Sequence, residues 1–152
     1  MYKIILYLFL LILSKNLYAD MIKPDPSISP KEVISIQLIA LQNNDLPFND
    51  AGIEQTWEFA HPKNRAFTGP LDNFIRMLKN PSYVMMIDHL EHKIITVQEQ
   101  EMNSYYFVEL IDSNGKKFGF EWTVEKVNQN GEFKDCWMTV GVSQPMPLSQ
   151  AS

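Results

Sequence analysis

The chain has 152 residues, of which 45% are hydrophobic, 12% aromatic and 20% charged, and its net charge is −5. This length and balance predict one globular domain and exclude a chain that is mainly disordered. The acidic balance gives no support for a nucleic-acid-binding surface. The single cysteine excludes a disulfide within the chain and disfavours a cysteine-based zinc site.

Residues 1–19 have the pattern of a secretory signal peptide that is cleaved after Ala19. Lys3 supplies a positive charge, residues 4–13 form an unbroken apolar run, and residues 14–19 are polar and end in a small side chain. A membrane-spanning helix needs about 20 apolar residues, so an uncleaved membrane anchor is the less favoured alternative. We therefore expect an exported protein, periplasmic or secreted, with no stable membrane association after cleavage.

Residues 20–28 contain two prolines and are expected to form an extended leader, which the first helix follows. Ser29 matches a helix N-cap, Pro30 suits the first turn, and Glu32 completes a capping box. Apolar residues then recur at helical spacing as far as Leu41. This combination is a strong signal for a helix start.

Two further helices are predicted before residue 82. The first covers about residues 50–60 and ends at His61, because the residue before a proline avoids the α conformation. Residues 63–65 then form a polar turn. The second helix begins at residues 68–70, carries an apolar stripe and ends before Pro81.

Beyond residue 81 the hydrophobic period changes from about 3.6 to 2, which is typical of strands. We predict strands at residues 89–99, 104–112, 117–127 and 133–143. Asn-Gly pairs at 114–115 and 130–131 indicate hairpins between the later strands. A loose tail is expected over residues 146–152.

The third and fourth strands show which side of the sheet is buried. Phe118, Phe120 and Trp122 alternate with polar residues, so one face is expected to be buried and the other wet. In the fourth strand we expect Cys136, Met138, Val140 and Val142 on one side, with Asp135, Trp137 and Thr139 on the other.

Helices first and an antiparallel meander afterwards predict an α+β fold. The N-terminal helices should pack on a curved antiparallel sheet of about four strands, in a single domain over residues 29–145. A curved sheet that is closed by helices leaves a cone-shaped hollow.

This order resembles the nuclear-transport-factor-2-like superfamily, also called the SnoaL-like or cystatin-like cone. Within it, the chain is most similar to an uncharacterised group of bacterial and plant domains of unknown function. The likeness covers about residues 30–143 and is carried by residues 33–45 (VISIQLIALQNND), Gly52-Ile53, residues 57–60 (WEFA), residues 69–74 (GPLDNF), Met77-Leu78, residues 136–138 (CWM) and Gly141-Val142. It implies the fold rather than the function, because the superfamily hosts isomerases, dehydratases and non-catalytic binders.

Aromatic residues supply the candidate ligand site and the candidate interface. The side chains expected to line an apolar hollow are Trp57, Phe74, Tyr83, Phe118, Phe120 and Trp122. The alternative is that they simply fill the core. Tyr105, Phe107 and Trp137 are expected on the opposite sheet face as a partner surface. The resemblance implies a homodimer through that face.

The titratable side chains give no convincing catalytic set. Asp72, Glu109, Glu121 and Asp135 are the acid–base candidates, but none stands among the apolar inward positions of the pattern. Cys136 lies mid-strand and is interpreted as a buried structural thiol.

The histidines are given structural interpretations. His61 is assigned to a helix end or an exposed turn, with a pocket base or anion contact as the alternative. His89 and His92 are assigned to the solvated start of a strand, where odd spacing sends side chains to opposite faces. A metal site there is the less favoured alternative, and no metal or cofactor is predicted.

Three functions remain open. The favoured one is a non-catalytic binding module for a small apolar ligand or a protein partner. The second is a small isomerase- or hydrolase-like enzyme that uses a pocket carboxylate. The third is a structural or accessory envelope protein that acts through its sheet face.

Overall fold

A computed structural model describes residues 20–149, so the predicted signal peptide lies outside the described residues. The fold is α+β, as predicted. The elements are α2 (Pro30–Gln42), α3 (Ala51–Glu58), α4 (Pro62–Thr68), α5 (Leu71–Leu78), the 3-10 helix η1 (Val84–Met86), β1 (Glu91–Glu99), β2 (Asn103–Ile111), β3 (Lys117–Lys126), β4 (Trp137–Val142) and β5 (Met146–Pro147).

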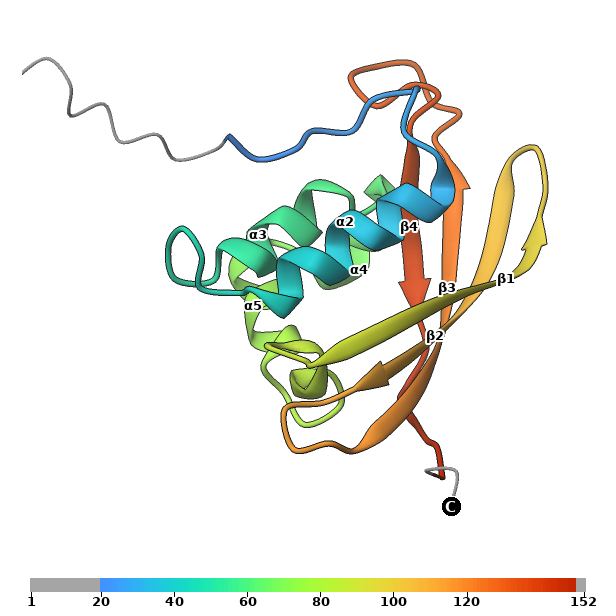
Figure 1. The fold of residues 1–152 in the computed structure, drawn as a ribbon. Coiled ribbons are helices and arrows are strands. Elements are labelled where there is room, and N and C mark those ends of the chain that lie inside the picture. The colour runs from blue at the N-terminus through green and yellow to red at the C-terminus, as the bar shows by residue number, and fades with distance from the viewer. Residues whose placement is uncertain (1–19, 150–152) are drawn as a thin grey trace, which may run out of the picture.

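The helices all lie on one side of a curved antiparallel sheet (Figure 1). The strand order is β1-β2-β3-β4, and β5 continues the row of β4 along β3. Between helices and sheet lies the main core, to which α2 and β3 contribute many of the buried side chains. In the described part of the chain, no helix is long and apolar enough to cross a membrane.

The capping box that the sequence predicts at the start of α2 is present. The Glu32 N–H donates to Ser29 Oγ at 3.3 Å, and the Ser29 N–H donates to Glu32 Oε2 at 2.9 Å. These two bonds satisfy donors that a helix start leaves without intrahelical partners. One side of the helix is fully buried, and Gln37 is the polar residue on that side.

The alternation predicted for β3 is confirmed. Phe120, Trp122 and Val124 are at most 2% exposed, and Phe118 is partly buried against the same core. Glu121, between two of them, faces solvent. The strand therefore presents one buried face to the helices.

The side assignment predicted for β4 is wrong, because a bulge interrupts its register with β3. Thr123 pairs with Gly141 and Val124 pairs with Thr139, so Val140 is an extra residue. Thr139 and Val142 therefore both face the helices, although three positions separate them. Periodicity alone cannot reveal such an insertion, because a shift of one residue exchanges the two faces of a strand.

Four short segments differ from the sequence prediction. Residues 62–68 form α4 rather than a polar turn, and η1 was not predicted. Residues 133–136 belong to the loop before β4 rather than to the strand. In this loop Cys136 joins Val127 and Met138 in a second small core, and Phe133 packs against it. Residues 146–147 form β5 rather than a loose tail, while residues 150–152 lie outside the described part.

Candidate functional site

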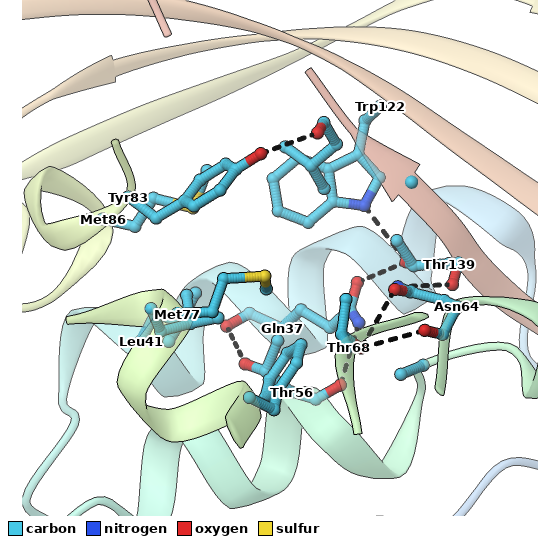
Figure 2. Close-up of a pocket in the computed structure, with 15 residues that line it drawn as sticks. Gln37, Leu41, Thr56, Asn64, Thr68, Met77, Tyr83, Met86, Trp122 and Thr139 are labelled. Atoms are coloured by element: carbon cyan, nitrogen blue, oxygen red, sulfur yellow. Dashed lines mark hydrogen bonds between the residues drawn. The ribbon is translucent and has the colours of Figure 1, made fainter. Parts of the chain in front are cut away.

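A cavity of about 140 Å³ lies between the helices and the sheet (Figure 2). Its walls come from α2, α3, α4, α5, the η1 segment, β3 and β4. The residues that line it are Gln37, Leu41, Thr56, Ala60, Asn64, Thr68, Phe74, Met77, Leu78, Tyr83, Met86, Trp122, Thr139, Gly141 and Val142. In Figure 2 the Met77 side chain points from α5 toward the middle of the space, opposite Trp122.

A chain of hydrogen bonds across the cavity wall connects the first helix to the sheet. Trp122 Nε1 donates to Thr139 Oγ1 at 3.1 Å, and Thr139 Oγ1 donates to Gln37 Oε1 at 2.6 Å. Gln37 Nε2 then donates to the Thr56 carbonyl at 3.1 Å. All four residues are at most 5% exposed, so these bonds remove the large penalty of burying unpaired polar groups.

A second polar wall comes from α4. Asn64 Nδ2 donates to the Thr139 carbonyl at 3.2 Å, and Thr68 Oγ1 donates to the Asn64 carbonyl at 2.9 Å. Opposite them, Tyr83 Oη donates to the Val142 carbonyl at 3.2 Å. Each hydroxyl oxygen keeps lone pairs that can accept a further hydrogen bond.

The cavity is electrically neutral. Among its lining residues, all in the described part of the chain, Tyr83 is the only ionisable one. Burial raises the pKa of Tyr83 above its ordinary value, so the phenol stays protonated at neutral pH. The walls therefore offer apolar surface together with uncharged amides and hydroxyls.

The structure brings three of the six predicted ligand-site residues to the cavity. Phe74, Tyr83 and Trp122 line it. Phe118 and Phe120 belong to the main core instead. Trp57 does not line the cavity but packs against Phe74, with the two ring centroids 5.1 Å apart. The Arg65 guanidinium lies over the Trp57 ring, 4.8 Å from its centroid.

Sequence reasoning missed most of the polar lining. Gln37 lies on the apolar stripe of the first helix. That position could have indicated a polar group in the site, because a polar residue on a buried stripe needs a buried hydrogen-bond partner. Asn64 and Thr68 were missed together with α4. The His61-Pro62 pair could have predicted the start of that helix, since proline suits the first helical position.

The four carboxylate candidates lie away from the cavity. Asp72, Glu121 and Asp135 are exposed, and Glu109 forms an ion pair with Lys117 at 3.2 Å. None of the four is among the lining residues, all of which belong to the described region. The arrangement therefore brings no carboxylate to the space where a substrate would bind.

His61 is a buried N-cap rather than the end of a helix. Its Nδ1 accepts the Lys63 N–H at 3.1 Å at the start of α4. Burial, the main influence, lowers the pKa of His61 and favours the neutral ring that can accept this bond. The predicted exposed turn is therefore wrong, and the cap that His61 provides is at the start of α4 rather than at the end of the preceding helix.

His89 and His92 also differ from their prediction. Asp88 has a positive φ of 55°, and His89, which follows it just before β1, lies next to His92 on that strand. His89 is 2% exposed, so the solvated start of a strand is wrong for this residue. No group of three or more metal-ligating side chains occurs within residues 20–149.

Cys136 is buried, as predicted. It packs with Val127 and Met138 in the small second core. Burial raises the pKa of its thiol, and the carboxylates of Asp25 and Asp135 act in the same direction. A thiol with a raised pKa is a poor nucleophile at neutral pH.

The three predicted interface residues do not share a face. Tyr105 and Phe107 lie on the outer face of β2, and Tyr105 is 38% exposed. Trp137 is two positions from the inward-facing Thr139, and it packs against the main core. A partner surface on the outer sheet face therefore lacks Trp137, and the homodimer stays a prediction.

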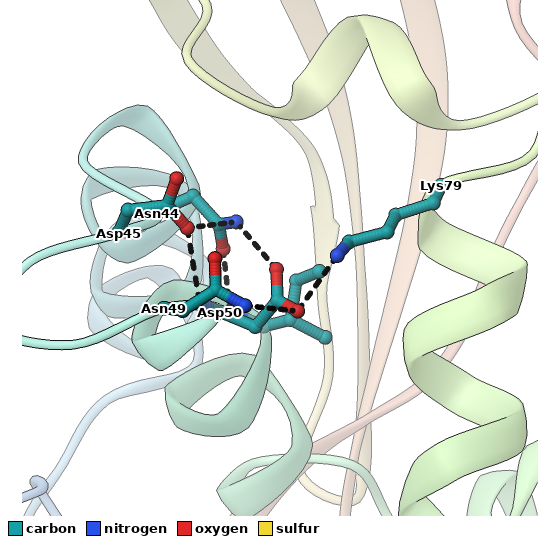
Figure 3. Close-up of polar contacts among 6 residues, drawn as sticks. Asn44, Asp45, Asn49, Asp50 and Lys79 are labelled. Carbon is teal, nitrogen blue, oxygen red and sulfur yellow. Dashed lines mark hydrogen bonds and ion pairs between the residues drawn. The ribbon is translucent and has the colours of Figure 1, made fainter.

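A compact polar cluster orders the turn between α2 and α3 (Figure 3). Asn44 Oδ1 accepts the Ile53 N–H at 3.0 Å, and Asn44 Nδ2 donates to Asp50 Oδ1 at 3.0 Å. The Lys79 ammonium donates to Asp50 Oδ2 at 2.7 Å. The lysine neutralises the mostly buried carboxylate, so the cluster ties α5 to the turn rather than forming an open site.

Comparison with family models, curated proteins and solved structures gives no significant match to this chain.

Proposed function

We propose that the protein is an exported, non-catalytic binding module whose cavity takes one small, uncharged and mainly apolar molecule. The observation that carries the proposal is the cavity itself, about 140 Å³ in volume and without a charged lining side chain in the described structure. The volume of the cavity limits the size of the ligand, and its uncharged lining favours a neutral molecule.

The volume supports a ligand of roughly six to eight non-hydrogen atoms. An engineered apolar cavity of about 150 Å³ binds benzene. Sites for drug-sized ligands occupy about 300–1,000 Å³. A fatty acid or a large cofactor would therefore need the walls to open.

The polar groups support recognition of one hydrogen-bonding group on such a molecule. Tyr83 and Thr68 both use their hydroxyl hydrogens within the protein, so their oxygens act toward a ligand as acceptors. A charged group would enter without a counter-charge, and burying an unpaired charge is very unfavourable. A phenol or a small alcohol fits these walls, whereas a carboxylate does not.

The enzyme alternative has less support. A pocket carboxylate with a raised pKa is what a small acid–base enzyme of this shape would use, and the four candidates lie elsewhere. The binding proposal needs only the shape and polarity that the cavity has.

Thermal unfolding with a small panel of probes tests the proposal. Benzene, phenol and cyclohexanol at millimolar concentration should raise the midpoint, because a ligand at ten times its Kd stabilises the folded state by about 1.4 kcal/mol. Benzoate and benzylammonium are the charged controls and should have no effect. Equal shifts with benzoate, or no shift with any neutral probe, would contradict the proposal.

A variant that fills the cavity localises the binding. Val142 faces the helices opposite Trp122, so Val142→Phe should place a ring in the space and abolish the neutral-probe shifts. Val97→Phe is the matched control, because Val97 is 66% exposed on β1 and outside the cavity lining. Probe binding that survives Val142→Phe would assign the ligand to another place.

Export has its own test. We expect the exported protein to begin at Asp20, so its intact mass should lack residues 1–19. A Leu8→Arg change within the apolar run should block export and retain the full-length mass. Export of the full-length mass would instead support the uncleaved anchor.

A further inference from the structure

His89 and His92 form a hydrogen-bonded pair directly behind the cavity wall. His89 Nδ1 lies 2.7 Å from the Met86 carbonyl oxygen, and His89 Nε2 lies 2.7 Å from His92 Nδ1. The His89 ring is 2% exposed, and His92 is partly buried on β1. The pair thus connects the end of η1 to the first strand.

The partners fix which ring nitrogens carry hydrogen. A carbonyl oxygen can only accept, so His89 Nδ1 must donate to Met86. In the neutral ring, His89 Nε2 is then an acceptor, and His92 Nδ1 must donate to it. The lone pair of the neutral pair is left on His92 Nε2, on the more exposed of the two rings.

This arrangement opposes full protonation. A first proton can bind at His92 Nε2 without breaking the pair. A second proton at His89 Nε2 would point one N–H at another, so the two rings would have to separate. The contact between the rings therefore holds only while at least one of the two rings is neutral.

Burial acts in the same direction as this geometry. It lowers the pKa of both His89 and His92 below the ordinary value of 6.5. The charged groups around the pair are Asp88 beside His89, Glu91 and Lys93 on β1, Glu109 on β2 and Lys117 on β3. Glu109 and Lys117 form an ion pair with each other, so neither sign of charge dominates around the two rings. The residues that α2 contributes beside the pair, Leu41 and Gln42, are uncharged.

The pair supports a segment that forms part of the cavity wall. Met86 is the last residue of η1, and Tyr83 is its N-cap. Both line the cavity, and the Met86 carbonyl is the acceptor for His89. We propose that the His89–His92 pair is a pH-dependent latch that holds η1 against the cavity at neutral pH and releases it, with any bound molecule, when acid protonates both rings.

The release of a ligand rests on the proposed function, but the latch does not. A histidine whose pKa is lower in the folded state contributes stability that is complete above the unfolded pKa near 6.5 and is lost as the pH falls below it. For each proton taken up on unfolding, the folded-to-unfolded ratio should fall about tenfold per pH unit. The pKa of His61 is also lowered by burial. His61 therefore adds to the loss of stability in acid, and its contribution has to be removed from the measurement.

NMR of the ligand-free protein tests the latch directly. The His61→Asn background removes the third histidine and keeps an N-cap acceptor. Ring ¹⁵N shifts should show Nδ1–H tautomers for both remaining histidines at pH 7.5. The Met86 methyl and Tyr83 ring signals should then move with the pair between pH 7 and 5, while Met138, in the second core, should not. Protonation of the pair with Met86 unmoved would overturn the proposal.

The double variant His89→Gln, His92→Asn replaces both titrating rings with amides that can still donate and accept. In the same background, phenol should bind at least tenfold more weakly at pH 5.5 than at 7.5, and the variant should lose less than twofold. Equal pH dependence in both proteins would overturn the latch. If phenol binds at neither pH but Met86 still moves, the latch stands and the proposed function fails.

Discussion

Thr139→Val tests the hydrogen bonds that join the first helix to the sheet. The change keeps the shape of the side chain and removes its hydroxyl, so Trp122 Nε1 and Gln37 Oε1 both lose their partner. Each is buried, and a buried polar atom left unsatisfied costs about 1–3 kcal/mol. The added methyl group returns about 0.8 kcal/mol of burial. We expect a net loss of about 3 kcal/mol in the free energy of unfolding.

Urea unfolding followed by far-UV circular dichroism measures this loss, because tryptophan fluorescence would itself respond to the change at Trp122. The slope m should stay constant if the same surface is exposed on unfolding. Thr123→Val is the matched control, since Thr123 is partly exposed on the outer face of the neighbouring strand. It should change stability by less than about 0.5 kcal/mol. Equal losses for both variants, or less than about 0.5 kcal/mol for Thr139→Val, would refute the reasoning.

Two further predictions concern the outer face and the polar cluster. A Cβ at Gly119 would lie 2.3 Å from Phe107 Cζ, so Gly119→Ala should destabilise the protein by about 1–2 kcal/mol. Phe107→Ala should relieve that loss in a double-mutant cycle, and a purely additive cycle would rule the clash out. Although burial alone raises the pKa of Asp50, its bonds to Lys79 and Asn44 lower it overall. Its contribution to stability is therefore present above the unfolded pKa and lost as the pH falls, so Lys79→Met should move the acid-unfolding midpoint to higher pH. An unchanged midpoint would contradict this.

The parts of the fold that the sequence could predict are those determined locally. The capping box at Ser29 needs only four consecutive residues, and the alternation of Phe120 and Trp122 needs only one strand. Each pattern reflects a nearby physical requirement, namely helix-end donors or a buried face. Both are therefore present in the structure at the predicted places.

The errors arise where distant or irregular backbone decides the outcome. The bulge at Val140 exchanges the faces of β4, and the positive φ of Asp88 turns His89 toward His92. No hydrophobic period carries either signal. α4 was missed because none of its residues is buried, so it lacks an apolar stripe.

The candidate site was only partly predictable for a related reason. Its aromatic members were among the large apolar residues of the sequence. Its polar members are defined by bonds across the fold, as between Gln37 and Thr139, which are 102 positions apart. Such a pair can be recognised only once α2 lies over β4.

Binding at the cavity can be observed most directly through its two methionines. With ¹³C-labelled methionine methyl groups, a phenol titration should shift the Met77 and Met86 signals saturably, because both side chains line the cavity. Met102 and Met146 are exposed elsewhere and serve as internal controls. Val142→Phe should abolish the shifts. If Met77 and Met86 stay unmoved, or move no more than Met102 and Met146, the cavity does not bind such a molecule.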